Sequence, residues 1–134
     1  VEQFGFVSGV GCEAARMMAF RKMARLQNSS TPFYVLQIDL RSAYNAVNLF
    51  ILHKLIKRAG FWSKEEIQLW RFLATNSTTW LDGEEVQDRN GLPQGSLLSP
   101  MLFNLYINDL LIEARKLKST LSLGYADDLI AITH

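Results

Sequence analysis

The chain has 134 residues and a net charge of +1; 49% of its residues are hydrophobic and 20% are charged. This composition is typical of one globular domain and excludes a disordered chain of low hydrophobicity. No apolar run approaches the roughly 20 residues that a membrane span requires, and Cys12 is the single cysteine, so we expect neither a membrane partner nor an internal disulfide.

Positive charge is unevenly placed along the chain. The sequence pI is about 8.1, below the value of about 9 that is usual for a nucleic-acid-binding domain. Lysine and arginine gather in two clusters, Arg16, Arg21, Lys22 and Arg25 in the first and Arg115, Lys116 and Lys118 in the second. Each cluster alone is most simply interpreted as a solvated helix face, so charge does not identify the partner.

The first predicted elements are a helix and a strand. Apolar residues recur at helical spacing across residues 11–27, and the polar segment 28–32 breaks the pattern. The β-branched and aromatic segment 33–38 predicts a buried strand that delivers Asp39 at its C-terminal end.

Two further helices and a hairpin are predicted in the middle of the chain. Residues 49–59 form an amphipathic helix with Gly60 as its stop, and its apolar face consists of Leu52, Leu55 and Ile56. Ser63 begins a capping box that opens a second helix reaching about Ala74. Residues 78–86 predict a hairpin whose two-residue turn is Asp82-Gly83.

The last third predicts a loop, a long helix and two strands. Residues 90–93 are loop, and Pro100 fits the first turn of an apolar helix. Two strand-like runs, 121–125 and 129–132, are joined by a tight turn at 126–128. Helices mixed with antiparallel strands predict an α+β fold in which helices pack on one face of an antiparallel sheet.

Three aspartates fall at the ends of predicted strands. Asp39 ends one strand, while Asp127 and Asp128 occupy the turn of a predicted hairpin. Adjacent carboxylates are electrostatically costly unless a cation offsets them, and oxygen-only ligands suit Mg²⁺. If the two strands are neighbours, the carboxylates converge and can hold two metals about 4 Å apart. The alternative for the Asp-Asp pair alone is an ordinary polar turn.

Four motifs in order resemble those of one enzyme family. Residues 38–44 resemble the first catalytic motif of reverse transcriptases, 91–104 their Pro-Gln-Gly motif, and 125–128 their signature hairpin. Residues 3–15 resemble the segment that precedes the first aspartate in the non-LTR, group II intron and mitochondrial-plasmid enzymes. Because the motifs cover most of the chain, it is identified as a member of the reverse transcriptase family, with RNA-directed DNA polymerase activity implied.

The resemblance implies a metal-binding role for several residues. Asp39 and Asp127 bind both metals, Asp128 completes the acidic cluster, and the Leu40 carbonyl assists. The implied cofactors are two Mg²⁺ ions, with Mn²⁺ as the alternative. The implied partners are an RNA template, a DNA or RNA primer and deoxynucleoside triphosphates.

It also implies nucleotide and template contacts. Tyr44 stands where the family places a ring that excludes a ribose 2′-hydroxyl; a packed core aromatic is the other interpretation. Gln94 and Gly95 line the nucleotide and template pocket, where glycine permits close backbone approach. Tyr125 lies near the primer terminus or packs in the core.

The implied architecture is a polymerase palm with part of the fingers. Residues 1–32 form a fingers-proximal segment and 33–134 the palm core of a single partial reverse transcriptase domain. We expect the N-terminal fingers and C-terminal thumb to lie outside this segment, so other segments or other protein chains complete the enzyme.

Departures from the family pattern leave a second function open. Val7 and Val10 stand where intron-type relatives commonly carry arginines that approach template or triphosphate, and Asn45 stands where many carry aspartate. The alternative function is a degenerate, polymerase-derived module with a structural or RNA-binding role in a larger ribonucleoprotein assembly. An RNA-dependent RNA polymerase is disfavoured by Tyr44 and by Ala126 in the turn.

Overall fold

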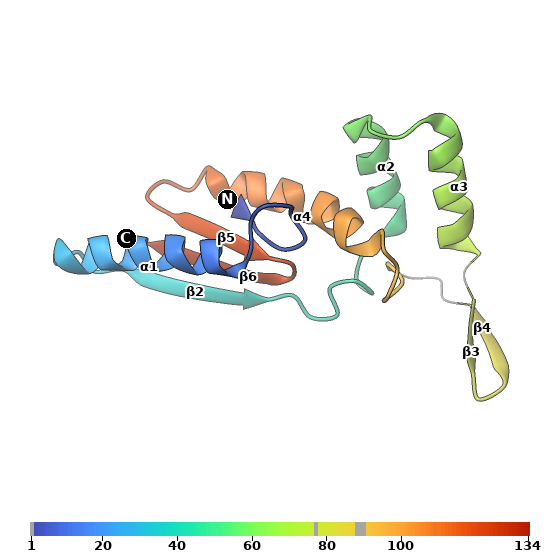
Figure 1. Ribbon diagram of the computed structural model, residues 1–134, viewed down its shortest axis with the longest axis horizontal. Helices are drawn as coiled ribbons and strands as arrows, with labels where there is room; N and C mark the ends of the chain where they lie inside the picture. The colour runs from blue at the N-terminus through green and yellow to red at the C-terminus, as the bar shows by residue number, and fades with distance from the viewer. Residues whose placement is uncertain (1, 77, 88–90) are drawn as a thin grey trace. The chain divides into compact units, whose positions relative to one another are not determined.

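The structure is a computed structural model that describes residues 2–76, 78–87 and 91–134 (Figure 1). The chain forms two compact units: unit 1 comprises Val1–Arg41 and Ile107–His134, and unit 2 comprises Ser42–Tyr106. In chain order the elements are β1 (Glu2–Gln3), α1 (Cys12–Asn28), β2 (Tyr34–Asp39), α2 (Leu49–Ala59), α3 (Lys64–Thr75), β3 (Thr78–Leu81), β4 (Glu84–Gln87), α4 (Ser99–Arg115), β5 (Leu121–Tyr125) and β6 (Asp128–Thr133). The mixture of helices with antiparallel strands confirms the predicted α+β composition.

Unit 1 is built on a sheet with the strand order β1-β5-β6-β2. β1 runs parallel to β5, whereas β5–β6 and β6–β2 are antiparallel pairs. In the β5–β6 pair Leu123 lies opposite Ile130 and Leu121 opposite Ile132. Because directly opposite residues share a face, these four side chains form one apolar face of the sheet.

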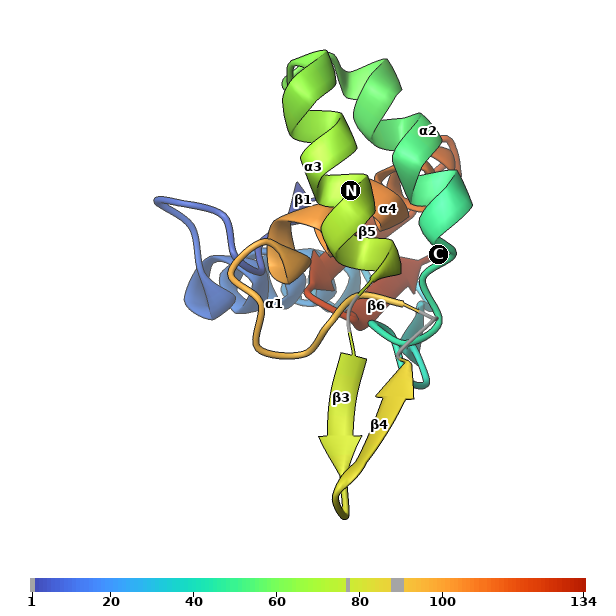
Figure 2. The ribbon, with the colours of Figure 1, turned by 90° about the vertical axis from the view of Figure 1, so that its right-hand side faces the viewer.

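Helix α1 covers that apolar face. The buried cluster there consists of Phe4, Ala19, Leu26, Leu123 and Ile132. Alternate residues of the strands point to the other face, where Leu129 is also buried. Figures 1 and 2 place the part of α4 within unit 1 on the opposite side of the sheet from α1. The expectation that helices pack on only one face of the sheet therefore differs from the structure. Both faces of the β5–β6 hairpin carry apolar side chains.

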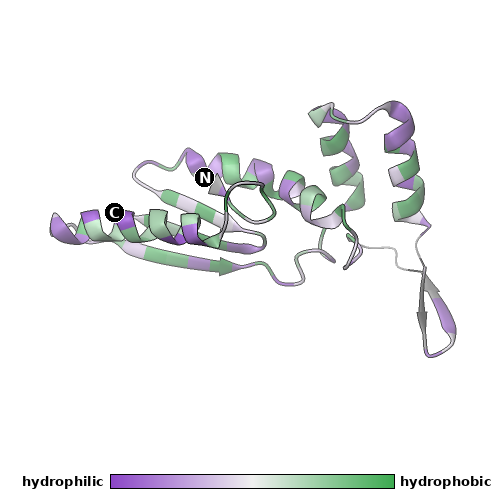
Figure 3. Cartoon of the chain, viewed as in Figure 1, coloured by the Kyte–Doolittle hydropathy of each residue, from purple (hydrophilic) through white to green (hydrophobic). Residues whose placement is uncertain are grey.

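Strand β2 is present as predicted, but the prediction that it is buried is wrong. All six of its residues are exposed, including Tyr34 at 74% and Leu36 at 57%, although half of them are apolar (Figure 3). β2 is the outer strand of the sheet and pairs with β6 on one side. Helix α1 packs against β5 and β6, so β2 extends beyond the covered part of the sheet.

Unit 2 contains the helix pair α2 and α3, which pack against each other. The predicted apolar face of α2, Leu52, Leu55 and Ile56, is buried. Gly60 ends α2 in the left-handed conformation, with φ +70°. Ser63 and Glu66 form the predicted reciprocal capping box at the start of α3. Within the described residues no helix is long and apolar enough to cross a membrane.

The β3–β4 hairpin has the predicted two-residue turn. Asp82 and Gly83 both have positive φ, +51° and +84°, which is the signature of a type I′ turn. Its register pairs Leu81 with Glu84, so local turn chemistry accounts for this element.

Gly91 allows the loop of residues 91–98 to approach the backbone of residues 44–45 closely, because it has no side chain. Its φ is +81°, and a Cβ atom there would lie 2.4 Å from the Tyr44 carbonyl oxygen and 2.5 Å from the Asn45 Cα. Leu92 N–H donates to the same Tyr44 oxygen at 2.8 Å. The loop therefore lies directly on the backbone of residues 44–45.

We predict that Gly91→Ala destabilises the protein more than Gly60→Ala. Both glycines have positive φ, but a Cβ at Gly60 meets nothing within 4 Å. Gly60→Ala therefore costs only the backbone strain, about 1–2 kcal/mol, whereas Gly91→Ala adds a clash with immobile backbone. The free energies of unfolding from urea titrations measure the difference, and equal losses would contradict the close approach at Gly91.

Candidate active site

Two of the three predicted aspartates are direct neighbours in unit 1. Asp39 is the last residue of β2 and lies opposite Asp128, the first residue of β6. Opposite residues of an antiparallel pair have Cβ atoms about 4.5–5.5 Å apart on the same face. β2 and β6 are neighbours, which is the condition that the sequence analysis set for convergence of the carboxylates. Asp128, expected in the turn, belongs instead to β6, and the turn itself contains Ala126 and Asp127.

The turn that carries Asp127 has an unusual backbone. Tyr125 and Asp128 are the last opposed pair of the hairpin, and Ala126 has a φ of +55° while Asp127 does not have positive φ. Positive φ at the first central residue is the signature of a type II′ turn, in which glycine is preferred. An alanine there carries a backbone cost of about 1–2 kcal/mol, so contacts from elsewhere must hold the turn.

Those contacts come from the N-terminal strand, to which the sequence analysis assigned no role at this site. Gln3 exchanges two hydrogen bonds with the backbone of Ala126, at 3.0 and 3.2 Å. Phe4 N–H donates to the Gly124 carbonyl at 2.8 Å. The resemblance of residues 3–15 to the family pattern was the available signal, but local spacing could not place Gln3 beside a turn more than 120 residues away.

The three carboxylates are uncompensated in the described part of the chain. Asp39 and Asp128 are exposed and Asp127 is half-buried, and none of the three side chains has a hydrogen-bond or ion-pair partner among the described residues. Like charges held this close disfavour one another, and a bound cation offsets the repulsion. The backbone thus places the Asp39 and Asp128 side chains next to each other at one end of the sheet.

The three aspartates have the right chemistry for a hard divalent cation, but their side chains are not arranged around a common point. Carboxylate oxygens are the ligands that Mg²⁺ and Mn²⁺ prefer. Across the described residues, however, no three acidic, histidine or cysteine side chains are arranged to hold a metal ion. The backbone brings the aspartates to one end of the sheet, while the expected convergence of three side chains is absent. Leu40 follows Asp39 directly and is half-buried.

A small hollow lies beside Asp128, on the face of the sheet that carries Asp39 and Asp128. Its volume is about 190 Å³, and Tyr125, Asp128, Gln37 and Ala15 are among its lining residues. Tyr125 is 42% exposed, so its ring is not sequestered in the core. The hollow gives the acidic end of the sheet a concave side next to the tyrosine.

The predicted nucleotide-pocket residues belong to unit 2. Tyr44 is half-buried and its ring stacks on Phe103, with centroids 5.1 Å apart. Its carbonyl receives the Leu92 N–H, which brings residue 44 next to the loop that carries Gln94 and Gly95. Both loop residues are exposed. The packing role of Tyr44 is therefore observed, and a role in sugar selection stays a prediction.

Ser99 shapes the start of α4. It is 2% exposed, and its hydroxyl donates to the Pro93 carbonyl at 2.7 Å. Pro100 follows in the first turn. This contact fixes the loop of residues 91–98 onto the helix.

His53 has a packing role rather than a ligand role. Its ring stacks on Trp70 with centroids 6.3 Å apart, and its Nδ1 is buried without a hydrogen-bond partner. Burial lowers the pKa of the His53 imidazole, and the positive charges of Lys57 and Arg71 lower it further. His53 is half-buried, because Trp70 of α3 covers one side of its ring.

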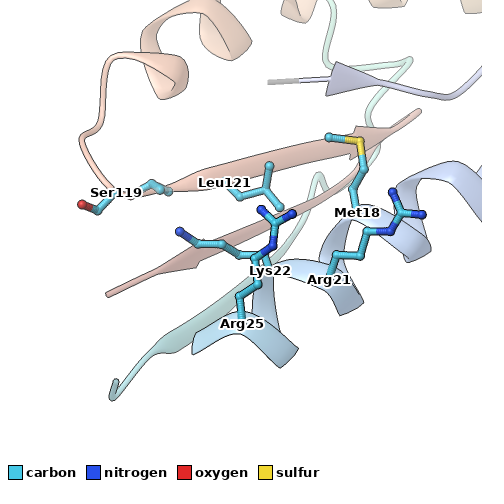
Figure 4. Close-up of a pocket in the computed structure, with 7 residues that line it drawn as sticks. Met18, Arg21, Lys22, Arg25, Ser119 and Leu121 are labelled. Carbon is cyan, nitrogen blue, oxygen red and sulfur yellow. The ribbon is translucent and has the colours of Figure 1, made fainter. Parts of the chain in front are cut away.

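Three of the four residues of the first basic cluster line a pocket in unit 1. Figure 4 shows Arg21, Lys22 and Arg25 of α1 beside Ser119 and Leu121. The pocket volume is about 400 Å³, and no carboxylate lines it. Leu121 and Tyr125 are the two ends of β5, and four residues of strand span about 13 Å. The basic pocket therefore lies at the opposite end of β5 from the aspartates.

Comparison with known proteins gives one assignment. No curated protein matches the chain significantly. The family model described as "Reverse transcriptase (RNA-dependent DNA polymerase)" matches residues 1–134. This match covers both units, including the acidic end of the sheet and the loop at Tyr44, and the chain belongs to the reverse transcriptase (RNA-dependent DNA polymerase) family.

Proposed function

We propose that this chain is the palm core of an RNA-directed DNA polymerase that adds deoxynucleotides to a primer 3′-hydroxyl on an RNA template. The observation that carries the proposal is the direct opposition of Asp39 and Asp128, with Asp127 in the adjoining turn. In a chain of this family, carboxylates gathered at one end of a sheet suit oxygen-coordinated metal ions.

Asp39, Asp127 and Asp128 are the proposed metal ligands, with the Leu40 carbonyl assisting. When bound, two Mg²⁺ or Mn²⁺ ions stabilise the attacking and leaving oxygens of nucleotidyl transfer. The carboxylates hold this charge at a fixed place on the sheet, and Tyr125 borders the same place. Tyr44, Gln94 and Gly95 are the proposed nucleotide and template contacts.

Further protein segments or chains complete the proposed enzyme. Affinity for a nucleic-acid duplex comes largely from phosphate contacts. The net charge of this chain is +1, which supplies little of that attraction. Fingers and thumb segments, in the same polypeptide or in other chains, therefore provide most of the binding affinity for template and primer.

We predict that Asp39→Asn and Asp127→Asn each abolish primer extension by the complete gene product. Removing one metal-binding carboxylate forfeits several kcal/mol of transition-state stabilisation, a loss of at least about a hundredfold in rate. Extension of an RNA-templated primer with Mg²⁺ and deoxynucleotides measures the effect. Asp82→Asn is the matched control, because it removes an exposed carboxylate from a turn that tolerates asparagine. Near-normal extension by both site variants would refute the assignment.

We predict that Tyr44→Ala increases ribonucleotide incorporation by about tenfold or more, because a steric contact with the 2′-hydroxyl is lost. Tyr44→Phe keeps the ring and its stacking on Phe103, so it should retain the selectivity of the parent. The ratio of incorporation rates for matched deoxy- and ribonucleotides measures selectivity. An unchanged ratio in Tyr44→Ala would leave Tyr44 with its packing role alone.

The alternative is a non-catalytic, polymerase-derived module that binds RNA or has a structural role in a ribonucleoprotein assembly. The basic pocket favours it, because Arg21, Lys22 and Arg25 line a concave surface without a carboxylate. Such a pocket suits the phosphates of an RNA strand and stands apart from the aspartates.

For this alternative we predict that Arg21→Gln and Arg25→Gln each weaken RNA binding and flatten its salt dependence. Each lost phosphate contact lowers the slope of log affinity against log salt by about 0.7 for a single strand. Lys64→Gln, an exposed cation of unit 2, is the charge-matched control. Identical slopes for all three variants would count against a phosphate contact in the basic pocket. Retained RNA binding without primer extension would favour the alternative over the polymerase.

A further inference from the structure

We infer that Gln3 is a positioning residue of the proposed polymerase: its side-chain amide clamps the Ala126 peptide groups and so fixes the turn that carries Asp127. This inference rests on the proposed function for its effect on catalysis. The clamp itself consists of contacts inside unit 1 and can be tested without any activity.

The clamp uses both ends of the Gln3 carboxamide. Gln3 Nε2 donates to the Ala126 carbonyl oxygen at 3.2 Å, and Ala126 N–H donates to Gln3 Oε1 at 3.0 Å. The Gly5 N–H also donates to Gln3 Oε1, at 2.8 Å. Because two N–H groups converge on the same atom, that atom must be the oxygen, which fixes the orientation of the amide.

Ala126 needs such a partner for two reasons. Its φ of +55° is unfavourable for a residue with a Cβ. It is also buried, at 8% exposure, and buried backbone N–H and C=O groups require hydrogen bonds. Strained backbone persists only where its surroundings over-determine it. Gln3 supplies that constraint by satisfying both polar groups of the strained residue.

Gly5 makes room for the clamp, and Gly124 lies beneath it. A Cβ on Gly5 would lie 2.3 Å from the Ala126 nitrogen, so only glycine allows the chain after Gln3 to lie on the turn. A Cβ on Gly124 would lie 3.4 Å from Gln3 Nε2 and 3.1 Å from Leu129 Cδ2. Gln3 is aligned with Gly124 in the parallel β1–β5 pairing. The side chain thus passes over Gly124 to reach the turn.

The position of the clamp connects it to the proposed chemistry. Asp127 follows Ala126 directly, and Asp128 begins the strand that faces Asp39. Rotation of the Ala126 peptide groups moves the Asp127 carboxylate relative to Asp39. Small misplacements of reacting groups cost catalysis up to about a hundredfold. Gln3 touches no substrate in this scheme and acts through the turn.

The first test is amide hydrogen exchange, which does not depend on the proposed function. Gln3→Met keeps the length of the side chain but can neither donate nor accept these hydrogen bonds. We expect faster exchange of the amides at residues 124–127 in this variant and unchanged exchange in α2 and α3. Gln68→Met, an exposed glutamine of α3, is the matched control and should leave the turn unchanged. Exchange of the turn amides at the parent rate in Gln3→Met would overturn the clamp.

The second test is catalysis by the complete gene product. For Gln3→Met we expect kcat for primer extension to fall about 10- to 100-fold, the usual range for residues that orient ligands, with little change in the KM for deoxynucleotide. The Mn²⁺ concentration required for half-maximal binding should rise in the same variant. Parent-like kcat and Mn²⁺ binding together with faster turn exchange would show a purely structural clamp and overturn the positioning role.

A third variant covers the case in which Gln3→Met does not fold. Gln3→Glu keeps an acceptor for the Ala126 and Gly5 N–H groups and loses only the donor to the Ala126 carbonyl. We expect the turn amides of Gln3→Glu to exchange faster than those of the parent. Exchange at the parent rate in Gln3→Glu would overturn the role of the donated bond. If the parent shows no extension while Gln3→Met loosens the turn, the clamp stands and the proposed function fails.

Discussion

The antiparallel pairing of β2 with β6 is the interaction on which the candidate site depends. Its register places Asp39 opposite Asp128 and continues without interruption from Tyr34–Thr133 to that acidic pair. A shift by one residue would turn every β2 side chain to the other face and separate the two carboxylates. The pairing is therefore held by backbone bonds along six residues against the repulsion of like charges at one end.

Burial of β5 and β6 makes that pairing possible, while β2 itself contributes little to the core. Ile132 is fully buried and Leu123 is 2% exposed, whereas β2 is exposed throughout. The hairpin thus provides a rigid template, and β2 adds to its edge. The acidic end combines the well-packed strand β6 with the exposed strand β2. Packing of β6 in the core therefore fixes the position of Asp128, whereas Asp39 is held only by the backbone hydrogen bonds between β2 and β6.

Local chemistry explains most of what the sequence could predict. The α2 face, the Ser63–Glu66 capping box and the Asp82-Gly83 turn depend on neighbours within four residues, and each is observed as expected. The burial of β2 was mispredicted, because composition reports apolarity and not which strand lies at an edge. The Gln3–Ala126 contact was missed because it joins residues 123 positions apart. The expected single domain, with residues 1–32 as a fingers-proximal segment and residues 33–134 as the palm core, stays a prediction.

The Gln3–Ala126 contact also joins the segment at residues 3–5 to the acidic end of the sheet. The segment at residues 3–5 and the Tyr125–Asp128 turn are more than 120 residues apart in the sequence, yet they share two hydrogen bonds and one backbone approach that only glycine permits. An alanine with positive φ is stable in the turn because the distant glutamine satisfies its peptide groups. The segment at residues 3–5 is therefore part of the acidic end of the sheet. The position of Asp127 depends on residues that carry no charge.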